Sequence, residues 1–368
     1  MAGHDVTMVH RDSIVIQAIK KNGIRLQDLD GTLTKVRVPV QKGPTRLPGT
    51  EVLIVAVKAY DTRAVATSYR GRIPPETTVV SLQNGLSNVE TLQSAFRNEI
   101  LAASTTEGAL SLGPGYVVHT GRGVTLIGGI RGANSDTSSR IKIAFDTAGL
   151  KAKICSNIHG VLWAKAIVNA AINPLSSLTR LPNGALAKNR EIREIANSTM
   201  NEGIAVSHAI GIRLVGDPRK LWRKILLSTR ANKSSMLQDI ERGKMTEIRQ
   251  LNGAILSHGK KTGVKTPVNG ILTKLVFGLE ESSKTMTSKE LNGLPLRTDH
   301  WFLQAVLVLP DFKAVSHTRM ASIASFPEGM GSTSSLTTFR KYSSSNRNGS
   351  SYRMYGLVII FEFSTVIS

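Results

Sequence analysis

Short runs of apolar and β-branched residues alternate with stretches of helical pattern over the first 150 residues. The most continuous runs are residues 51–57 (EVLIVAV) and 77–82 (TTVVSL). A strand covered on both faces has this uninterrupted apolar pattern, so the runs favour a parallel sheet flanked by helices. The expected strands are residues 5–9, 51–57, 77–82 and 100–104, with a hairpin of residues 117–119 and 124–127. The expected helices are residues 86–96 and 137–148.

After about residue 157 the apolar positions take a helical period, and strands largely stop. The expected helices are residues 161–175, 192–210, 220–227, 239–261 and 270–279, punctuated by Pro174, Pro182, Pro218 and Pro267. The pattern therefore predicts an α/β fold in two parts. A sheet domain over residues 1–150 precedes an all-helical domain over residues 151–284.

The pattern changes again in residues 285–368, which form an irregular tail. Residues 331–351 are rich in Ser and Thr, a composition typical of a flexible segment, and we expect the tail to be partly disordered. Residues 301–309 and 355–366 are apolar islands. Either island could add a strand or pack against a domain.

The net charge of +21 is large for a chain of 368 residues. It suggests anionic partners, either nucleic acid or small anionic molecules. Aromatic residues make up only 5% and the basic residues are spread along the chain, so nucleic acid is not the favoured partner. A single cysteine, no zinc-type spacing, no apolar leader and no apolar run of membrane length predict a cytoplasmic protein without a metal site.

The start of the chain reads as the last turn of a helix followed by a strand, AGHDVTMV. A doubly wound dinucleotide domain usually begins one strand earlier, with a G-x-G-x-x-G turn, and no such motif precedes a helix here. The strand is followed by Arg11 and Asp12. Arg11 stands where NADP-dependent enzymes bind the 2′-phosphate, and Asp12 is a suitable helix cap. The alternative for Arg11 is an ordinary exposed arginine at a strand end.

Three polar residues interrupt an otherwise apolar helix: Lys165, Asn169 and Asn173. Their spacing of four places them in one stripe on one helix face. Buried polar groups need partners, so the stripe predicts a polar ligand or, alternatively, a lysine reaching solvent and two asparagines bonded to loops. A second polar cluster follows at residues 232–248, in which Ser234 or Ser235 can cap a helix and Glu247 is expected inside that helix.

The runs LWAKAIVNAAINPL, PNG and NKSSMLQDIERGKMTEIRQLNG, with VKAY and LQNG before them, resemble the ketopantoate reductase (2-dehydropantoate 2-reductase) family. The resemblance extends from about residue 2 to 283. It implies a Rossmann-type first domain that lacks its first strand and glycine loop, and NADPH-dependent reduction of 2-dehydropantoate to pantoate on the route to pantothenate and coenzyme A.

The resemblance also implies roles for individual residues. Lys165 would be the catalytic proton donor, and Glu247 would lie near it and near the cofactor ribose. The substrate would contact Asn84, Asn169, Asn173, Asn183, Asn232 and Ser235. The cofactor NADP(H) would contact Arg11, Lys58, Asn84 and Glu247.

Other functions remain open at this stage. The missing glycine loop is compatible with a catalytically impaired remnant that serves as a binding or scaffold protein. A related reductase of another branched 2-keto acid would carry the same residues. The sequence leaves a homodimer possible and gives the tail no function.

Overall fold

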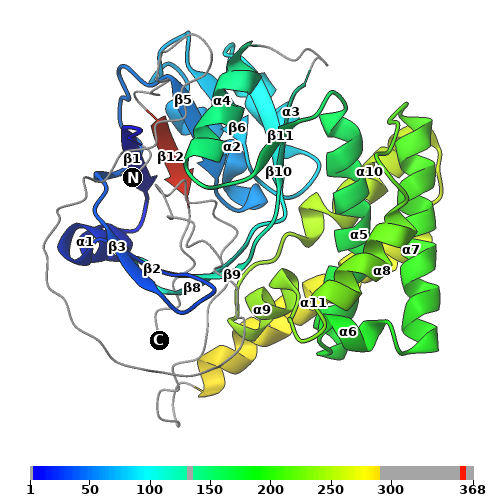
Figure 1. The fold of residues 1–368 in the computed structure, drawn as a ribbon. Coiled ribbons are helices and arrows are strands. Elements are labelled where there is room, and N and C mark those ends of the chain that lie inside the picture. Colours follow the sequence, from blue (N-terminus) through cyan, green and yellow to red (C-terminus); the bar gives the residue numbers. More distant parts are fainter. Residues whose placement is uncertain (1–2, 131–135, 291–356, 362–368) are drawn as a thin grey trace, which may run out of the picture.

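The structure is a computed structural model that describes residues 3–130, 136–290 and 357–361. Its first part is built on an eight-stranded sheet in the order β11-β10-β7-β6-β5-β12-β1-β4, in which every neighbouring pair is parallel except β10 and β7 (Figure 1). The strands are β1 (Val6–His10), β4 (Val40–Lys42), β5 (Val52–Ala56), β6 (Thr78–Ser81), β7 (Ile100–Thr105), β10 (Thr125–Gly129), β11 (Ala152–Ile154) and β12 (Leu357–Phe361).

Helices flank this sheet, as predicted for an α/β fold. They are α1 (Ser13–Asn22), α2 (Thr62–Tyr69), α3 (Asn88–Ala95) and α4 (Asp136–Thr147), with a short 3-10 turn η1 (Ala59–Asp61) before α2. Asp12 caps α1 by accepting a hydrogen bond from the backbone N–H of Ile14 at 2.7 Å, as the sequence predicted.

The strand order identifies the architecture. The run β4-β1-β12-β5-β6-β7 has the 3-2-1-4-5-6 order of a doubly wound dinucleotide-binding sheet. In this order β12, the last strand among the described residues, takes the position that the first strand normally has. One of the two apolar islands of the tail, residues 355–366, thus does add a strand, whereas residues 301–309 lie outside the described residues.

The predicted hairpin of residues 117–119 with 124–127 is wrong. These residues belong to different sheets: β9 (Tyr116–Gly121) pairs with β8 (Gly108–Gly113), while β10 pairs with β7. The strands β8 and β9 form a second, four-stranded sheet with β2 (Ile24–Gln27) and β3 (Leu33–Val36), in the order β3-β2-β9-β8. The true turn is at residues 113–115, where Gly113 and Gly115 both have positive φ.

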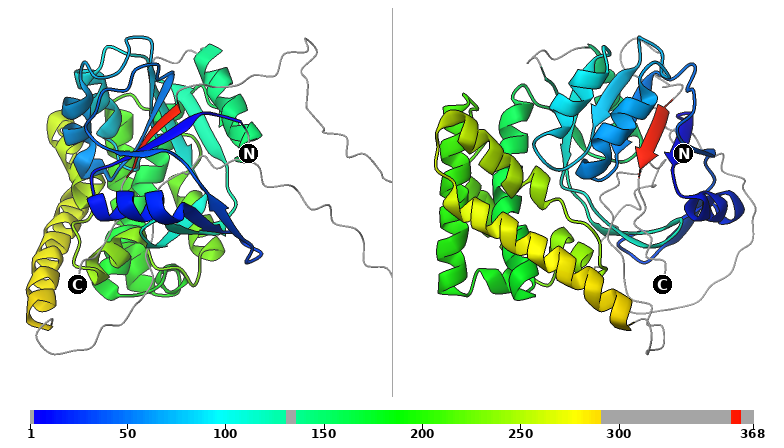
Figure 2. Two further views of the ribbon diagram at one scale, coloured as in Figure 1. Left: turned by 90° about the vertical axis from the view of Figure 1, so that its left-hand side faces the viewer. Right: turned by 180° about the vertical axis from the view of Figure 1, so that it is seen from behind.

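The helical part is packed around α5 (Ile158–Thr179), with the sheet part on one side (Figures 1 and 2). The other elements are α6 (Asn183–Leu186), α7 (Arg190–Ala209), α8 (Pro218–Ser228), α9 (Ser235–Glu241), η2 (Ile248–Gln250), α10 (Asn252–Thr262) and α11 (Pro267–Glu290). The prediction of one continuous helix over residues 239–261 is therefore wrong. The helix is interrupted between α9 and η2, and α10 begins at Asn252. No helix among residues 3–130 and 136–290 is both long enough and apolar enough to span a membrane.

Pro174 lies inside α5 and does not end it, contrary to the sequence prediction. A proline leaves the carbonyl four residues earlier without its helical donor, here that of Ala170. The side-chain amide of Asn252, which is fully buried, donates to this carbonyl at 3.0 Å. The helix thus continues through the proline because α10 supplies the lost hydrogen bond.

Candidate active site

Lys165 projects from α5 toward the sheet. Its Nζ donates a hydrogen bond to the backbone carbonyl of Thr105, at the end of β7, at 2.9 Å. Desolvation lowers the pKa of Lys165 to about 8, because burial disfavours the charged ammonium, and the nearby carboxylate of Glu247 opposes this shift. The ammonium is thus directed at the junction of the two parts of the chain.

Asn169 and Asn173 follow Lys165 on the same face of α5. The side chain of Asn173 is buried, at 7% exposure, and that of Asn169 is half-buried. Within the described part of the chain, no hydrogen bond is formed by either side-chain amide. The loop carbonyls that the alternative interpretation requires are therefore not their partners. Both amides can instead bind a polar ligand beside the ammonium.

Glu247 lies directly before η2 and not inside a helix, which corrects the sequence prediction. Its Oε1 accepts a hydrogen bond from the backbone N–H of Ala59, just after β5, at 2.9 Å, and its side chain is 6% exposed. Burial raises the pKa of Glu247, while the positive charge of Lys58, the Ala59 N–H and Lys165 oppose the shift. Glu247 thus connects the helical part to the sheet part electrostatically.

A buried ion pair lies next to Glu247. Lys58 Nζ and Asp239 Oδ2 are 2.8 Å apart, and their side chains are 13% and 6% exposed. Lys58 follows β5 and Asp239 belongs to α9, so the pair joins the two parts of the chain. Asp239 is a residue of this site that was not predicted from the sequence. The only available signal was its position in the run NKSSMLQDIERG, since neither period nor spacing predicts its partner.

Asn84 and Gly85 follow β6 and face η2. Asn84 is 8% exposed, and its carbonyl accepts a hydrogen bond from Asn88 Nδ2 at 2.6 Å. Gly85 has φ +97°, and a Cβ at this position would lie 3.0 Å from the Cβ of Gln250. The backbone N–H of Leu86 donates to the Gln250 carbonyl at 3.2 Å. A glycine is therefore needed here for the close approach of the sheet edge to η2.

The other predicted substrate residues lie on the helical side. Asn183 is buried, donates from Nδ2 to Thr229 Oγ1 at 2.9 Å, and its Oδ1 is buried without a hydrogen-bond partner among the described residues. Its backbone N–H donates to the carbonyl of Asn232, whose side chain is exposed. Ser234, not Ser235, caps α9, which leaves the Ser235 hydroxyl outside the cap. The helices α6 and α9, which carry Asn183 and Ser235, pack against α5.

A second feature is an open pocket of about 130 Å³ at the ends of β1 and β5. The guanidinium of Arg11 pairs with Asp61 Oδ1 at 2.9 Å, and the Arg11 side chain is 63% exposed. The other carboxylate oxygen, Asp61 Oδ2, is buried and has no hydrogen-bond partner among the described residues. The pocket is lined by Val9, His10, Arg11, Gly43, Pro44, Val57, Asp61, Ala64, Val65, Ser68 and Tyr69.

Comparison with protein families assigns both parts of the chain. Residues 1–132 match "Ketopantoate reductase PanE/ApbA", and residues 157–280 match "Ketopantoate reductase PanE/ApbA C terminal". The chain is 37% identical over 280 residues to the 2-dehydropantoate 2-reductase of Archaeoglobus fulgidus, an alignment that covers 76% of this chain and 91% of the relative. The enzyme of Pyrococcus horikoshii is also 37% identical over 280 residues, covering 76% and 90%.

Two solved structures have a similar fold. A PanE/ApbA family ketopantoate reductase from Ralstonia eutropha superposes with a TM-score of 0.72 and 33% sequence identity, covering 77% of this chain and 93% of that chain. D-mandelate dehydrogenase in a ternary structure with NADH and anilino(oxo)acetate superposes with a TM-score of 0.70 and 25% identity, with the same coverage.

Proposed function

We propose that this chain, which belongs to the ketopantoate reductase family and is an oxidoreductase of the 2-dehydropantoate 2-reductase type, reduces 2-dehydropantoate to pantoate with NADPH, for pantothenate and coenzyme A synthesis. One observation carries the proposal. The ammonium of Lys165 is held at the junction of the sheet and helical parts, with Glu247 in its electrostatic environment and two unbonded amides on the same helix face.

The chemistry requires these groups. A bound reduced nicotinamide supplies the hydride, and a ketone that receives a hydride develops negative charge on its oxygen. The Lys165 ammonium stabilises this charge and donates the proton that completes the hydroxyl. Because burial brings its pKa to about 8, the donor is still mostly protonated near pH 7 and yet gives up its proton readily. Asn169 and Asn173 bind the carboxylate and hydroxyl of the substrate without neutralising the lysine.

The described residues fit the two ends of a dinucleotide. Arg11 suits a 2′-phosphate, and Asp61, which pairs with its guanidinium, lines the same pocket. At the other end, Lys58 and Asn84 lie after β5 and β6, at the carboxyl edge of the sheet where a doubly wound fold binds its cofactor. Among residues 3–130, no glycine-rich turn precedes a helix.

The remaining parts of the proposal concern partners and compartment. The anionic partners of Arg11, Lys58 and Lys165 are small molecules, namely the keto acid and the dinucleotide. These side chains therefore need no nucleic-acid partner. We place the reaction in the cytoplasm, where the reduced coenzyme is available, and a homodimer is compatible with it. Cys155, the single cysteine, is free, as a reducing compartment allows.

The turnover assay tests the proposed reaction. We expect oxidation of NADPH by the purified full chain in the presence of 2-dehydropantoate, followed at 340 nm, to exceed that with other branched 2-keto acids and with phenylglyoxylate. A panel in which another keto acid gives the highest kcat/KM would assign a sibling reductase. Binding of NADPH in calorimetry without turnover of any keto acid would identify a binding protein and contradict the proposal.

The Arg11→Ala variant tests the choice of coenzyme. We expect KM for NADPH to rise about 10- to 100-fold, because a charged hydrogen-bond donor to a phosphate contributes about 1.5–3 kcal/mol, while KM for NADH changes little. The matched control is Arg190→Ala, an exposed arginine at the start of α7 that forms an ion pair with Glu194 of the same helix. An equal effect on NADH and NADPH would mean that Arg11 does not bind the 2′-phosphate.

A further inference from the structure

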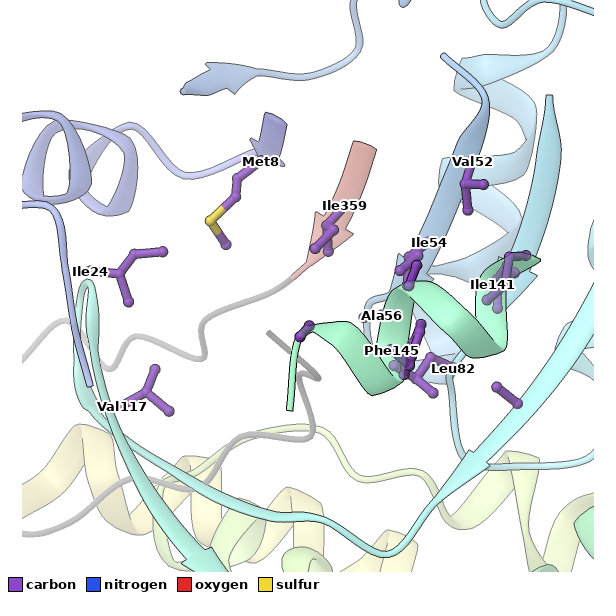
Figure 3. Close-up of a cluster of buried hydrophobic side chains, with 14 of the residues drawn as sticks. Met8, Ile24, Val52, Ile54, Ala56, Leu82, Val117, Ile141, Phe145 and Ile359 are labelled. Carbon is purple, nitrogen blue, oxygen red and sulfur yellow. The ribbon is translucent and has the colours of Figure 1, made fainter. Parts of the chain in front are cut away.

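The strand β12 joins two halves of the large sheet that do not otherwise pair. It pairs in parallel with β1 over residues 357–360 and with β5 over residues 357–361. The side chain of Ile359 is 2% exposed and lies in the core between Met8 of β1 and Ile54 of β5 (Figure 3). The segment that fills the centre of the sheet thus comes from beyond residue 290, far along the chain from both neighbours.

The spacing of strands explains why β1 and β5 cannot pair directly. Neighbouring strands lie about 4.8 Å apart, so β1 and β5 are separated by about 9.6 Å, too far for direct backbone hydrogen bonds. Without β12, the sheet would consist of β4-β1 on one side and β5-β6-β7-β10-β11 on the other. Each half would also present an unpaired strand edge at the middle of the domain.

The two halves carry the two walls of the Arg11–Asp61 pocket. One wall consists of residues 9–11, at the end of β1, with Gly43 and Pro44 after β4. The opposite wall consists of Val57 after β5 and the residues of η1 and α2 that line the pocket. The Arg11–Asp61 ion pair also crosses the pocket, but the Arg11 side chain is 63% exposed, and exposed ion pairs contribute little to stability.

From this arrangement we propose that β12 is a positioning element of the nucleotide pocket: the C-terminal strand holds the wall that carries Arg11 at a fixed distance from the wall that carries Asp61. Residues 357–361 thereby perform the structural role of the first strand of the domain. The identity of the ligand rests on the function proposed above, whereas the bridging of the two walls rests only on the sheet.

The test uses the full chain with Ile359→Asp, which places a charge in the core between Met8 and Ile54. The matched control is Ile271→Asp, at an isoleucine of α11 that is 58% exposed. Hydrogen exchange followed by mass spectrometry reports on the walls, and calorimetry with 2′,5′-ADP, which carries the adenosine and 2′-phosphate alone, reports on the pocket.

We expect Ile359→Asp to remove exchange protection from β1 and β4 while α5 and α10 keep theirs. We expect 2′,5′-ADP affinity to fall about tenfold or more, since apparent affinity falls with the fraction of molecules in which the pocket is formed. A peptide of residues 354–363 added to the variant should restore both signals, and Ile271→Asp should change neither. If Ile359→Asp unfolds the whole chain, the same measurements are made on Ile359→Ala. We then expect a smaller loss of exchange protection, still confined to β1 and β4, and a smaller loss of 2′,5′-ADP affinity.

Three results would overturn the proposal. They are unchanged protection of β1 and β4 in the Ile359 variants, protection lost equally from α5 and α10 in the Ala variant, or lost protection with unchanged 2′,5′-ADP affinity. If the unsubstituted chain binds no 2′,5′-ADP but the variants selectively lose protection of β1 and β4, the coenzyme assignment fails while the bridging of the walls is supported.

Discussion

Lys165→Ala is expected to lower kcat for keto-acid reduction by about 10²–10⁴-fold, the usual contribution of a positioned general acid. The variant removes both the proton donor and the positive charge that faces the developing oxyanion. Affinity for NADPH, measured by calorimetry, should change little. A desolvated ammonium with one hydrogen bond, to the Thr105 carbonyl, adds little to stability, so the melting temperature should stay close to that of the unsubstituted chain.

The pH dependence adds a second signature of the same lysine. Reduction requires the ammonium form, so its rate should fall as pH rises through about 8, the pKa to which burial lowers Lys165. Oxidation of pantoate requires the neutral amine as proton acceptor, so its rate should rise over the same range. The control is Lys220→Ala, an exposed lysine of α8. A Lys165→Ala variant with more than about a tenth of the original kcat would exclude this lysine as the proton donor.

The polar stripe of α5 could be predicted because it depends on local periodicity alone. Lys165, Asn169 and Asn173 share a face in any regular helix, and an apolar sequence around them indicates burial. Their hydrogen-bond partners could not be predicted, since Thr105 lies 60 residues before Lys165. The unusual continuation of the helix through Pro174 depends on Asn252, which is similarly remote.

The environment of Glu247 was mispredicted for the same reason. The helical period is continuous across residues 239–261, but α9 ends at Glu241, and Gly243 just beyond it takes φ +63°. The chain beyond it is held by Glu280 of α11, whose Oε1 accepts from the backbone N–H and the hydroxyl of Thr246. A local pattern cannot include this contact with a side chain 34 residues away. The turn it stabilises brings Glu247 to the backbone of Ala59.

Strand order posed the same difficulty. The apolar island at residues 355–366 was compatible with either a strand or a segment packed against a domain. Its position between β1 and β5 depends on pairing of Leu357 with Val6 and Val52, which lie 351 and 305 residues earlier. The sequence led to the expectation of a dinucleotide domain without its usual first strand and glycine loop. It contained no signal that a segment from the tail would occupy that position in the sheet.

Glu247 is expected to produce the second-largest loss of activity, and two variants separate its two roles. Glu247→Ala removes the acceptor of the Ala59 N–H and the negative charge beside Lys165, and we expect kcat/KM to fall about 10- to 100-fold, as for loss of a charged hydrogen-bond partner. Glu247→Gln keeps an oxygen acceptor for Ala59 and removes only the charge. The matched control is Glu241→Gln, an exposed carboxylate that pairs with Lys233 at the end of α9.

The pH profile of Glu247→Gln is the decisive measurement. The negative charge of Glu247 raises the pKa of Lys165 against the effect of burial, so its removal should lower that pKa below about 8. The fall of the reduction rate should then begin at lower pH than in the unsubstituted chain, whereas Glu241→Gln should leave the profile in place. An unshifted profile in Glu247→Gln would mean that this carboxylate does not act on Lys165, and that any loss in Glu247→Ala comes from the anchor to Ala59 alone.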